Sequence, residues 1–128
     1  MAGRPAVLGL HHVQVAAPRG SESRLRAFYG AVLGLTELAK PASLAARGGV
    51  WFQCGDLELH IGIEEDFRPA TKAHVAILVH DLDGWRARLE EHGHQVLVDR
   101  ALPGFSRFYV DDPAGNRLEL LEPLVTPP

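Results

Sequence analysis

The sequence is poor in cysteine, with Cys54 as its only one among 128 residues. A single cysteine excludes an intrachain disulfide and is typical of a protein kept in a reducing compartment, so we expect a cytoplasmic location. Cys54 lies beside a predicted turn and has no cationic neighbour in the sequence, which argues against a nucleophilic role. We therefore expect neither a disulfide-stabilised nor a cysteine-dependent class of protein.

Excess positive charge and long hydrophobic runs are also missing. Thirteen basic residues stand against 16 acidic ones, for a net charge of −3. Without a basic footprint, we expect no nucleic-acid partner and no anionic membrane surface as a partner. The apolar run before His11 is too short for a signal-peptide core or a membrane span. The length and the hydrophobic content of 46% predict one soluble domain over residues 1–128.

What the sequence does contain is an internal repeat that carries histidines and carboxylates. His12-Val13-Gln14-Val15 in the first half corresponds to His74-Val75-Ala76-Ile77 in the second, 62 residues later (74 − 12). Leu57-Glu58-Leu59 corresponds to Leu118-Glu119-Leu120, 61 residues later (119 − 58). A repeat of this length indicates two copies of one supersecondary unit. Its pseudo-symmetry predicts that four metal-ligand side chains come together.

The hydrophobic periodicity predicts the same order of elements in each half: strand, helix, strand, strand, strand. A serine, Ser21 or Ser23, can cap the first helix, and Asp81 or Asp83 the second. We expect module one at about 8–63, a linker at 64–72 and module two at about 73–122. The predicted strands are 10–16, 36–39, 50–54 and 57–63 in module one, and 74–79, 95–98, 106–110 and 116–121 in module two.

Strand alternation places each candidate ligand opposite an aliphatic row. On strand 57–63, Glu58 and His60 face away from Leu59 and Ile61, and on the last strand Glu119 faces away from Leu118 and Leu120. This pattern is what a metal site on the free face of a sheet requires. It is also what the wet face of an antiparallel sheet produces without any metal.

Four segments, in order and over nearly the full chain, resemble the vicinal oxygen chelate superfamily, which contains glyoxalase I, bleomycin- and fosfomycin-resistance proteins and extradiol dioxygenases. The most specific is the final Asp-Pro-x-Gly-Asn-x-Leu-Glu-Leu piece. The first two segments are Leu10-His11-His12-Val13-Gln14-Val15 and Phe28-Tyr29-Gly30-Ala31-Val32-Leu33-Gly34-Leu35. The third is Ala73-His74-Val75-Ala76-Ile77-Leu78-Val79, followed by Asp81-Leu82-Asp83, and the fourth is Phe108-Tyr109-Val110-Asp111-Asp112-Pro113-Ala114-Gly115-Asn116-Arg117-Leu118-Glu119-Leu120.

The resemblance implies an α+β fold of two tandem βαβββ modules, whose mixed and antiparallel sheets curl around a shared cavity. It implies a divalent metal held by His12, His74, Glu119 and Glu58, with Glu58 as the ligand that members with only three ligands lack. Zn, Ni, Mn, Fe and Co all suit such ligands, and affinity order alone does not select one. Family members usually form homodimers, sometimes by exchanging modules.

Three further residues are candidates for a substrate pocket. His60, two residues along from Glu58, can replace it as a ligand, line the pocket or shuttle protons. Arg107 and Tyr109 share one face of their strand, where Arg107 can hold a substrate carboxylate or phosphate. A solvated Arg107 and a core Tyr109 are the structural alternatives.

Three functions fit this residue set, each with a small-molecule substrate or ligand. The first is a metal-dependent lyase or isomerase of the glyoxalase type, in which Glu58 or Glu119 exchanges a proton as general base. The second is a ring-cleaving Fe(II) dioxygenase on His12, His74 and Glu119. The third is a metal-free protein that sequesters an antibiotic or a small hydrophobic ligand, although such a protein has no need of the ligand residues.

Overall fold

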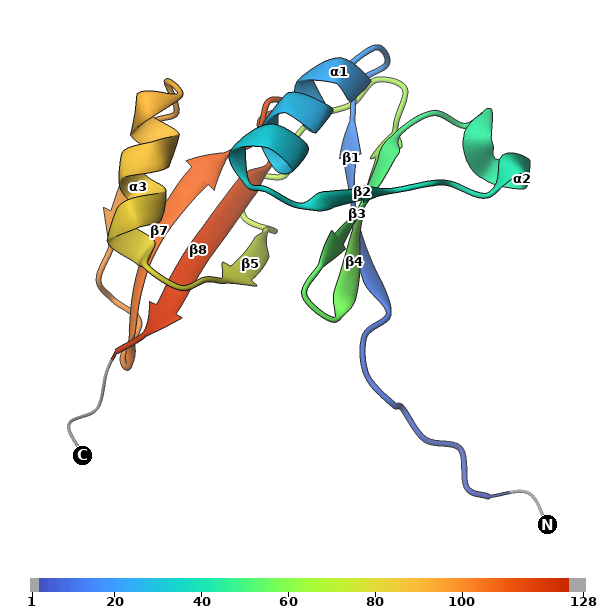
Figure 1. Ribbon diagram of the computed structural model, residues 1–128. Coiled ribbons are helices and arrows are strands. Elements are labelled where there is room, and N and C mark those ends of the chain that lie inside the picture. The colour runs from blue at the N-terminus through green and yellow to red at the C-terminus, as the bar shows by residue number, and fades with distance from the viewer. Residues whose placement is uncertain (1–2, 125–128) are drawn as a thin grey trace.

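The computed structural model describes residues 3–124, which form two sheets with helices on one side (Figure 1). Each half of the chain contributes four strands. Module one contains β1 (His12–Ala17), α1 (Glu22–Leu25), the π-helical segment η1 (Arg26–Val32), β2 (Thr36–Leu38), α2 (Ala42–Ala45), β3 (Val50–Cys54) and β4 (Leu57–Ile63). Module two contains β5 (Val75–Leu78), α3 (Leu82–Glu91), β6 (Leu97–Asp99), β7 (Phe105–Asp111) and β8 (Arg117–Pro123). The first half thus contains a continuous helix made of α1 and η1 and the short helix α2, and the second half contains one helix, α3.

The two modules have the same strand order, which confirms the predicted tandem βαβββ architecture. The first sheet runs β1-β4-β3-β2 and the second β5-β8-β7-β6. In each sheet the first strand pairs in parallel with the last strand of the module, and the other pairs are antiparallel. No helix within residues 3–124 is long and apolar enough to cross a membrane.

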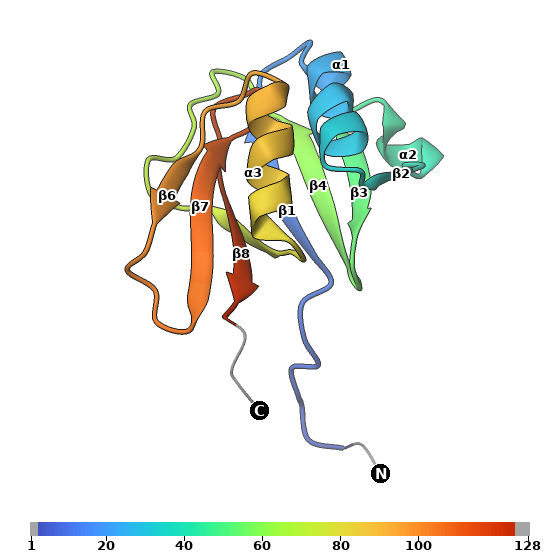
Figure 2. The same cartoon turned by 60° about the vertical axis from the view of Figure 1, so that its left-hand side comes forward.

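The helices α1, η1 and α3 lie side by side over the same side of the two sheets (Figure 2). The hydrophobic core fills the space beneath them and takes residues from both modules, among them Phe28, Phe52, Phe108 and Leu120. Burying these side chains on one face of each sheet leaves the opposite face free for polar residues.

The first helix occupies the predicted place but has wider turns than expected. Leu33 donates its backbone N–H to the carbonyl of Phe28, five residues back, at 2.9 Å, which is π-helical geometry. The adjacent residues Phe28 and Tyr29 are both buried, at 2% and 0% exposure. Gly34, with φ of +75°, follows the helix in the left-handed conformation predicted for its C-terminal cap.

Two local features differ from the sequence prediction. The alanine-rich stretch after Pro41, for which no element was predicted, forms the short helix α2. Strand β6 spans Leu97–Asp99 instead of 95–98, because its register is set by pairing with Tyr109, Phe108 and Arg107 on β7 rather than by its own apolar residues.

A buried polar network joins the two modules. The Tyr29 hydroxyl of η1 donates to Oδ2 of Asp112 at 2.6 Å, in the turn between β7 and β8. Asn116 in the same turn donates from Nδ2 to Asp112 at 3.0 Å and to the carbonyl of Ala16 on β1 at 2.8 Å. Asp112 also accepts the backbone N–H of Ala114 and of Asn116. The turn-forming residues of module two are therefore tied to a helix and a strand of module one.

A second connection joins α3 to the end of η1. Arg88 donates from Nε to the carbonyl of Val32 at 2.8 Å and from Nη2 to that of Ala31 at 3.0 Å. These carbonyls belong to the last turn of the helical segment, where carbonyl groups lack partners within the helix and a cation is favourable. Besides the shared hydrophobic core, the modules are thus joined by polar contacts of the side chains of Tyr29, Asp112, Asn116 and Arg88.

We predict that Tyr29→Phe lowers the free energy of unfolding by about 1–3 kcal/mol, because the buried Asp112 carboxylate loses one of its donors. Urea denaturation at a fixed protein concentration measures the change. Tyr109→Phe is the matched control, since the Tyr109 hydroxyl has no hydrogen-bond partner within residues 3–124 and its loss should change stability by less than about 0.5 kcal/mol. Equal effects of the two variants would contradict the network.

The same bond predicts how stability changes at high pH. Burial and the neighbouring Asp112 raise the pKa of Tyr29 well above its ordinary value of 10.0. The folded state then keeps a proton that the unfolded chain releases, so this contribution is complete below pH 10 and is lost as the pH rises further. Alkaline denaturation curves should show this loss in the wild type and less of it in Tyr29→Phe; identical curves would contradict it.

Candidate functional site

The candidate ligands lie on the free faces of the two sheets, in two groups that we call the first and second half-sites. The first half-site consists of His12 on β1 with Glu58 and His60 on β4, and His12 and Glu58 are register partners. The second half-site consists of His74, just before β5, with Glu119 on β8 and Arg107 and Tyr109 on β7. Tyr109 and Glu119 are register partners. The predicted faces are therefore the observed ones.

A stack of three rings organises the first half-site. His60 is sandwiched between Trp51 and His12, with ring centroids 3.9 Å and 4.2 Å away and interplanar angles of 3° and 16°. His60 is 4% exposed, whereas His12 forms the exposed end of the stack. The stack therefore holds one face of the His12 ring. His11 contacts the same ring edge-on, with centroids 5.2 Å apart and the two Nδ1 atoms 2.9 Å apart.

His60 also contacts the carboxylate of this half-site. Its Nε2 lies 2.9 Å from Oε1 of Glu58. The hydrogen bond from His60 is the largest cause of a lowered pKa of Glu58, which nearby histidines lower further. His60 thus contacts both His12 and Glu58, and Glu58 is ionised at neutral pH.

The second half-site is built around a buried carboxylate. Nε2 of His74 lies 3.0 Å from Oε1 of Glu119, whose side chain is only 4% exposed. Nδ1 of His74 lies 2.8 Å from the backbone carbonyl of Lys72. A carbonyl can only accept, so Nδ1 of His74 carries a hydrogen and a neutral ring has its lone pair on Nε2.

This tautomer has a chemical consequence. In neutral His74, the Nε2 lone pair and the Glu119 oxygen are two acceptors facing each other, which is unfavourable unless a proton or a cation lies between or beside them. A histidine whose Nδ1–H donates to a carbonyl is also the usual arrangement of a metal-ligating histidine. The donors present in the second half-site therefore fit a divalent metal.

A guanidinium closes one side of the second half-site. Arg107, 16% exposed in its side chain, contacts Oε1 of Glu119 at 3.3 Å and Oδ1 of Asp99 at 3.4 Å. It also lies over the Tyr109 ring at 5.4 Å from the centroid, and Arg117 lies at 4.9 Å from the same centroid. Nε of Arg107 is buried without a hydrogen-bond partner among the described residues. Arg107 is thus an ion-paired residue of this face.

The structure does not bring the two half-sites together in one chain. Within residues 3–124 no group of three or more histidine, cysteine, aspartate or glutamate side chains is placed to hold a metal ion. The expectation that all four ligands meet around one cavity is therefore not met within a single copy. Alternation along a strand predicts which face a side chain occupies, whereas the direction in which that face points depends on how the modules pack.

Three residues of these faces, Trp51, Asp99 and Arg117, are not among the site residues predicted from the sequence. The signal for Trp51 was available in the hairpin turn at Gly55, because pairing across that turn places Trp51 opposite His60. Asp99 had no such signal, since its position beside Arg107 follows from the shifted register of β6.

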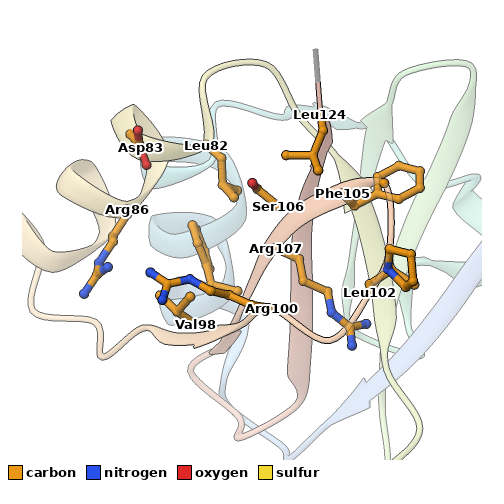
Figure 3. A pocket seen from close by; sticks show the side chains of 13 residues that line it. Leu82, Asp83, Arg86, Val98, Arg100, Leu102, Phe105, Ser106, Arg107 and Leu124 are labelled. Carbon is orange, nitrogen blue, oxygen red and sulfur yellow. The ribbon is translucent and has the colours of Figure 1, made fainter. Parts of the chain in front are cut away.

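The cavity in Figure 3 lies away from both ligand pairs. It measures about 410 Å³ and is lined by residues from α3, β6, β7 and the intervening loop, including Leu82, Arg86, Arg100 and Phe105. Arg107 also borders it, but its side chain points away from those of Arg86 and Arg100 (Figure 3). The candidate ligands His12, Glu58, His74 and Glu119 are not among its lining residues.

Comparison with known proteins identifies the family. Residues 9–120 match the model of the Glyoxalase/Bleomycin resistance protein/Dioxygenase superfamily, so the chain belongs to that superfamily. A glyoxalase family protein from Bacillus anthracis is 48% identical, with a TM-score of 0.90 over 94% of this chain and 99% of that one. A search of curated proteins returns no match.

Two more distant structures share the fold. Lactoylglutathione lyase from Agrobacterium tumefaciens is 24% identical, with a TM-score of 0.71 over 92% of this chain and 96% of that chain. A mutant of the fosfomycin resistance protein FosX from Listeria monocytogenes, in complex with Mn(II) and 1S,2S-dihydroxypropylphosphonic acid, is 18% identical, with a TM-score of 0.77 over 94% of this chain and 95% of that chain. One of these two structures, the FosX mutant, thus holds Mn(II) in a protein of the same fold.

We predict that His60→Phe raises the pKa of Glu58 toward its ordinary value of 4.5, because the ring stack persists while the hydrogen bond is lost. Carbon-13 NMR titration of the glutamate carboxyl groups in metal-free protein measures this pKa. Trp51→Phe, which leaves the His60–Glu58 contact in place, is the control and should change the pKa little. A pKa of Glu58 unaffected by His60→Phe would contradict the role given to this bond.

Proposed function

We propose that the protein is a divalent-metal-dependent lyase or isomerase of the glyoxalase type, acting on a small substrate that binds through its oxygens. The observation that carries the proposal is the contact between His74 and the buried carboxylate of Glu119, in which Nε2 lies 3.0 Å from a carboxylate oxygen while Nδ1 lies 2.8 Å from a backbone carbonyl. A proton or a metal cation makes this contact favourable, and imidazole with carboxylate is a ligand set that catalytic metals use. Membership in a superfamily with metal-dependent relatives supports the same conclusion.

The proposed metal site is completed by a second copy of the chain. His74 and Glu119 supply two ligands from one copy, and His12 supplies a third from its partner, with Glu58 as a further ligand or as a base beside it. A homodimer with twofold symmetry contains this arrangement twice, since each copy offers both half-sites. The separation of the half-sites within one chain is the reason for invoking the partner.

In this proposal the chain's own residues bind and orient the substrate. Arg107 is positioned beside Glu119 to attract a substrate oxyanion. His60 holds the His12 ring by stacking and Glu58 by its hydrogen bond. When bound, a divalent metal polarises a carbonyl oxygen and stabilises the negative charge that develops on it. Glu58 or Glu119 then exchanges the proton at the adjacent carbon as general base.

We predict that protein purified without chelator carries close to one metal per chain, and that His12→Ala and Glu119→Ala each remove most of it. Inductively coupled plasma mass spectrometry measures the metal, after reconstitution with Zn, Ni, Mn, Co or Fe(II) where needed. His92→Ala is the control, because among the described residues the exposed His92 ring hydrogen-bonds only to the Arg88 carbonyl of its own helix. Wild-type protein that takes up none of these metals would refute the enzyme proposal and favour a sequestering protein.

Mixed dimers test whether the site is shared between copies. A dimer of one His12→Ala chain and one Glu119→Ala chain, isolated with two different affinity tags, has one intact site and one that lacks both ligands. We expect it to bind about half of the metal that the wild type binds. If the ligands instead meet within one chain, both sites are defective and the mixed dimer binds no more than the parent variants.

A further inference from the structure

The chain begins with an extended segment that leaves the body of the molecule. Residues 3–11, which we call the N-terminal arm, are all exposed and project away from both modules in two views (Figures 1 and 2). Val7 and Leu8 are 94% and 98% exposed, and Leu10 is 69% exposed. Within residues 3–124, the only backbone hydrogen bond of the arm to the body is from the Glu58 N–H to the His11 carbonyl, at its last residue.

The other large exposed hydrophobic residues all lie in module two. Seven such residues occur within residues 3–124: Val7, Leu8 and Leu10 in the arm, and Leu78, Leu97, Val98 and Leu124 in module two. Leu78 follows His74 and Ala76 along β5, and Leu97 is the register partner of Tyr109, so both lie on the face of the second half-site. Val98 and Leu124 line the cavity of Figure 3 instead, whereas Leu78 and Leu97 lie on the two opposite edge strands of the second sheet. Exposed apolar side chains at both edges of this face indicate a surface that a partner covers.

We propose that the N-terminal arm packs against module two of a second copy of this chain, so that two arms are exchanged in a homodimer. The inference rests on the proposed function, because the shared site pairs the same regions: the half-site at the end of the arm with the half-site of module two. The partner is a second copy because the arm of each chain and the apolar residues of module two are both left uncovered by their own chain. A twofold dimer covers both sets at once.

The spacing along the chain supports this pairing. Leu8 precedes His12 by four residues, a reach of about 13 Å in an extended chain. Leu78 follows His74 by four residues, which is again about 13 Å along an extended strand. When His12 and His74 of two copies approach a common metal with their strands antiparallel, Leu8 of one copy falls beside Leu78 of the other. The arm therefore extends the proposed interface beyond the metal ligands.

Photo-crosslinking identifies what the arm touches. Protein with p-benzoylphenylalanine in place of Leu8 is mixed with nitrogen-15-labelled wild type, allowed to exchange subunits and irradiated, and crosslinked peptides are assigned by mass spectrometry. We expect crosslinks to labelled peptides from residues 74–124. The same probe in place of the exposed Arg24 on α1 is the control for random collision. Crosslinks confined to the probe's own chain or to labelled module one, or none above the control, overturn the proposal.

A second measurement tests the energetic contribution of the arm without disturbing the fold. The side chains of Val7 and Leu8 are almost fully exposed in a single chain, so Val7→Ser with Leu8→Ser leaves the monomer intact. We expect the double variant to raise the dimer dissociation constant in sedimentation experiments at least tenfold, and Ala6→Ser to leave it unchanged. An unchanged constant in the double variant overturns the proposal.

These outcomes separate the arm from the metal site. Mixed dimers that recover metal together with absent arm crosslinks refute only the exchange of arms. A wild type that binds metal as a monomer refutes the exchange and the shared site but not the metal itself. Failure of the metal experiment alone, with arm crosslinks present, refutes the proposed function and leaves the arm exchange standing.

Discussion

The buried bond between Tyr29 and Asp112 sets the arrangement of the whole molecule. Its two partners lie 83 residues apart, in different modules, and the same carboxylate organises the turn between β7 and β8. Asn116 extends the network to β1, the strand that carries His12. The position of the first half-site relative to the second therefore depends on hydrogen bonds between η1, β1 and the turn that joins β7 to β8. The network thus contacts β1, which carries His12, and the turn before β8, which carries Glu119.

Much of this arrangement could be predicted from the sequence, because strands impose a strict alternation of faces. The repeat of His12 and Glu58 as His74 and Glu119 predicted the two modules, and the alternation placed each ligand on the correct face. The relative placement of the modules had no comparable signal. It depends on Tyr29, which reads as one more apolar position of a helix, and on Asp112 and Asn116, which read as ordinary turn residues.

The two half-sites differ in the hydrogen-bond donors that each provides for its carboxylate, Glu58 in the first and Glu119 in the second. In the first, His60 is enclosed between two rings and bonds to Glu58, so the partially exposed carboxylate has a donor within the chain. In the second, the hydrogen bond of His74 to the Lys72 carbonyl makes Nε2 of a neutral ring an acceptor beside a buried carboxylate. Arg107 supplies part of the missing positive charge but contacts Asp99 as well. The carboxylate whose negative charge is least compensated within the chain is thus Glu119 in module two.

The separation of Tyr29 and Asp112 along the chain also has a consequence for the order of folding. Each module closes its own four-stranded sheet, with strand pairs that need no residue of the other half. Closing a loop of more than 80 residues to join Tyr29 to Asp112 is entropically the more demanding step. We therefore expect the Tyr29–Asp112 bond, which lies at the junction of the two modules, to form after the strand pairs within each sheet. The hydrogen bonds of this network then fix the two modules relative to each other in the native state.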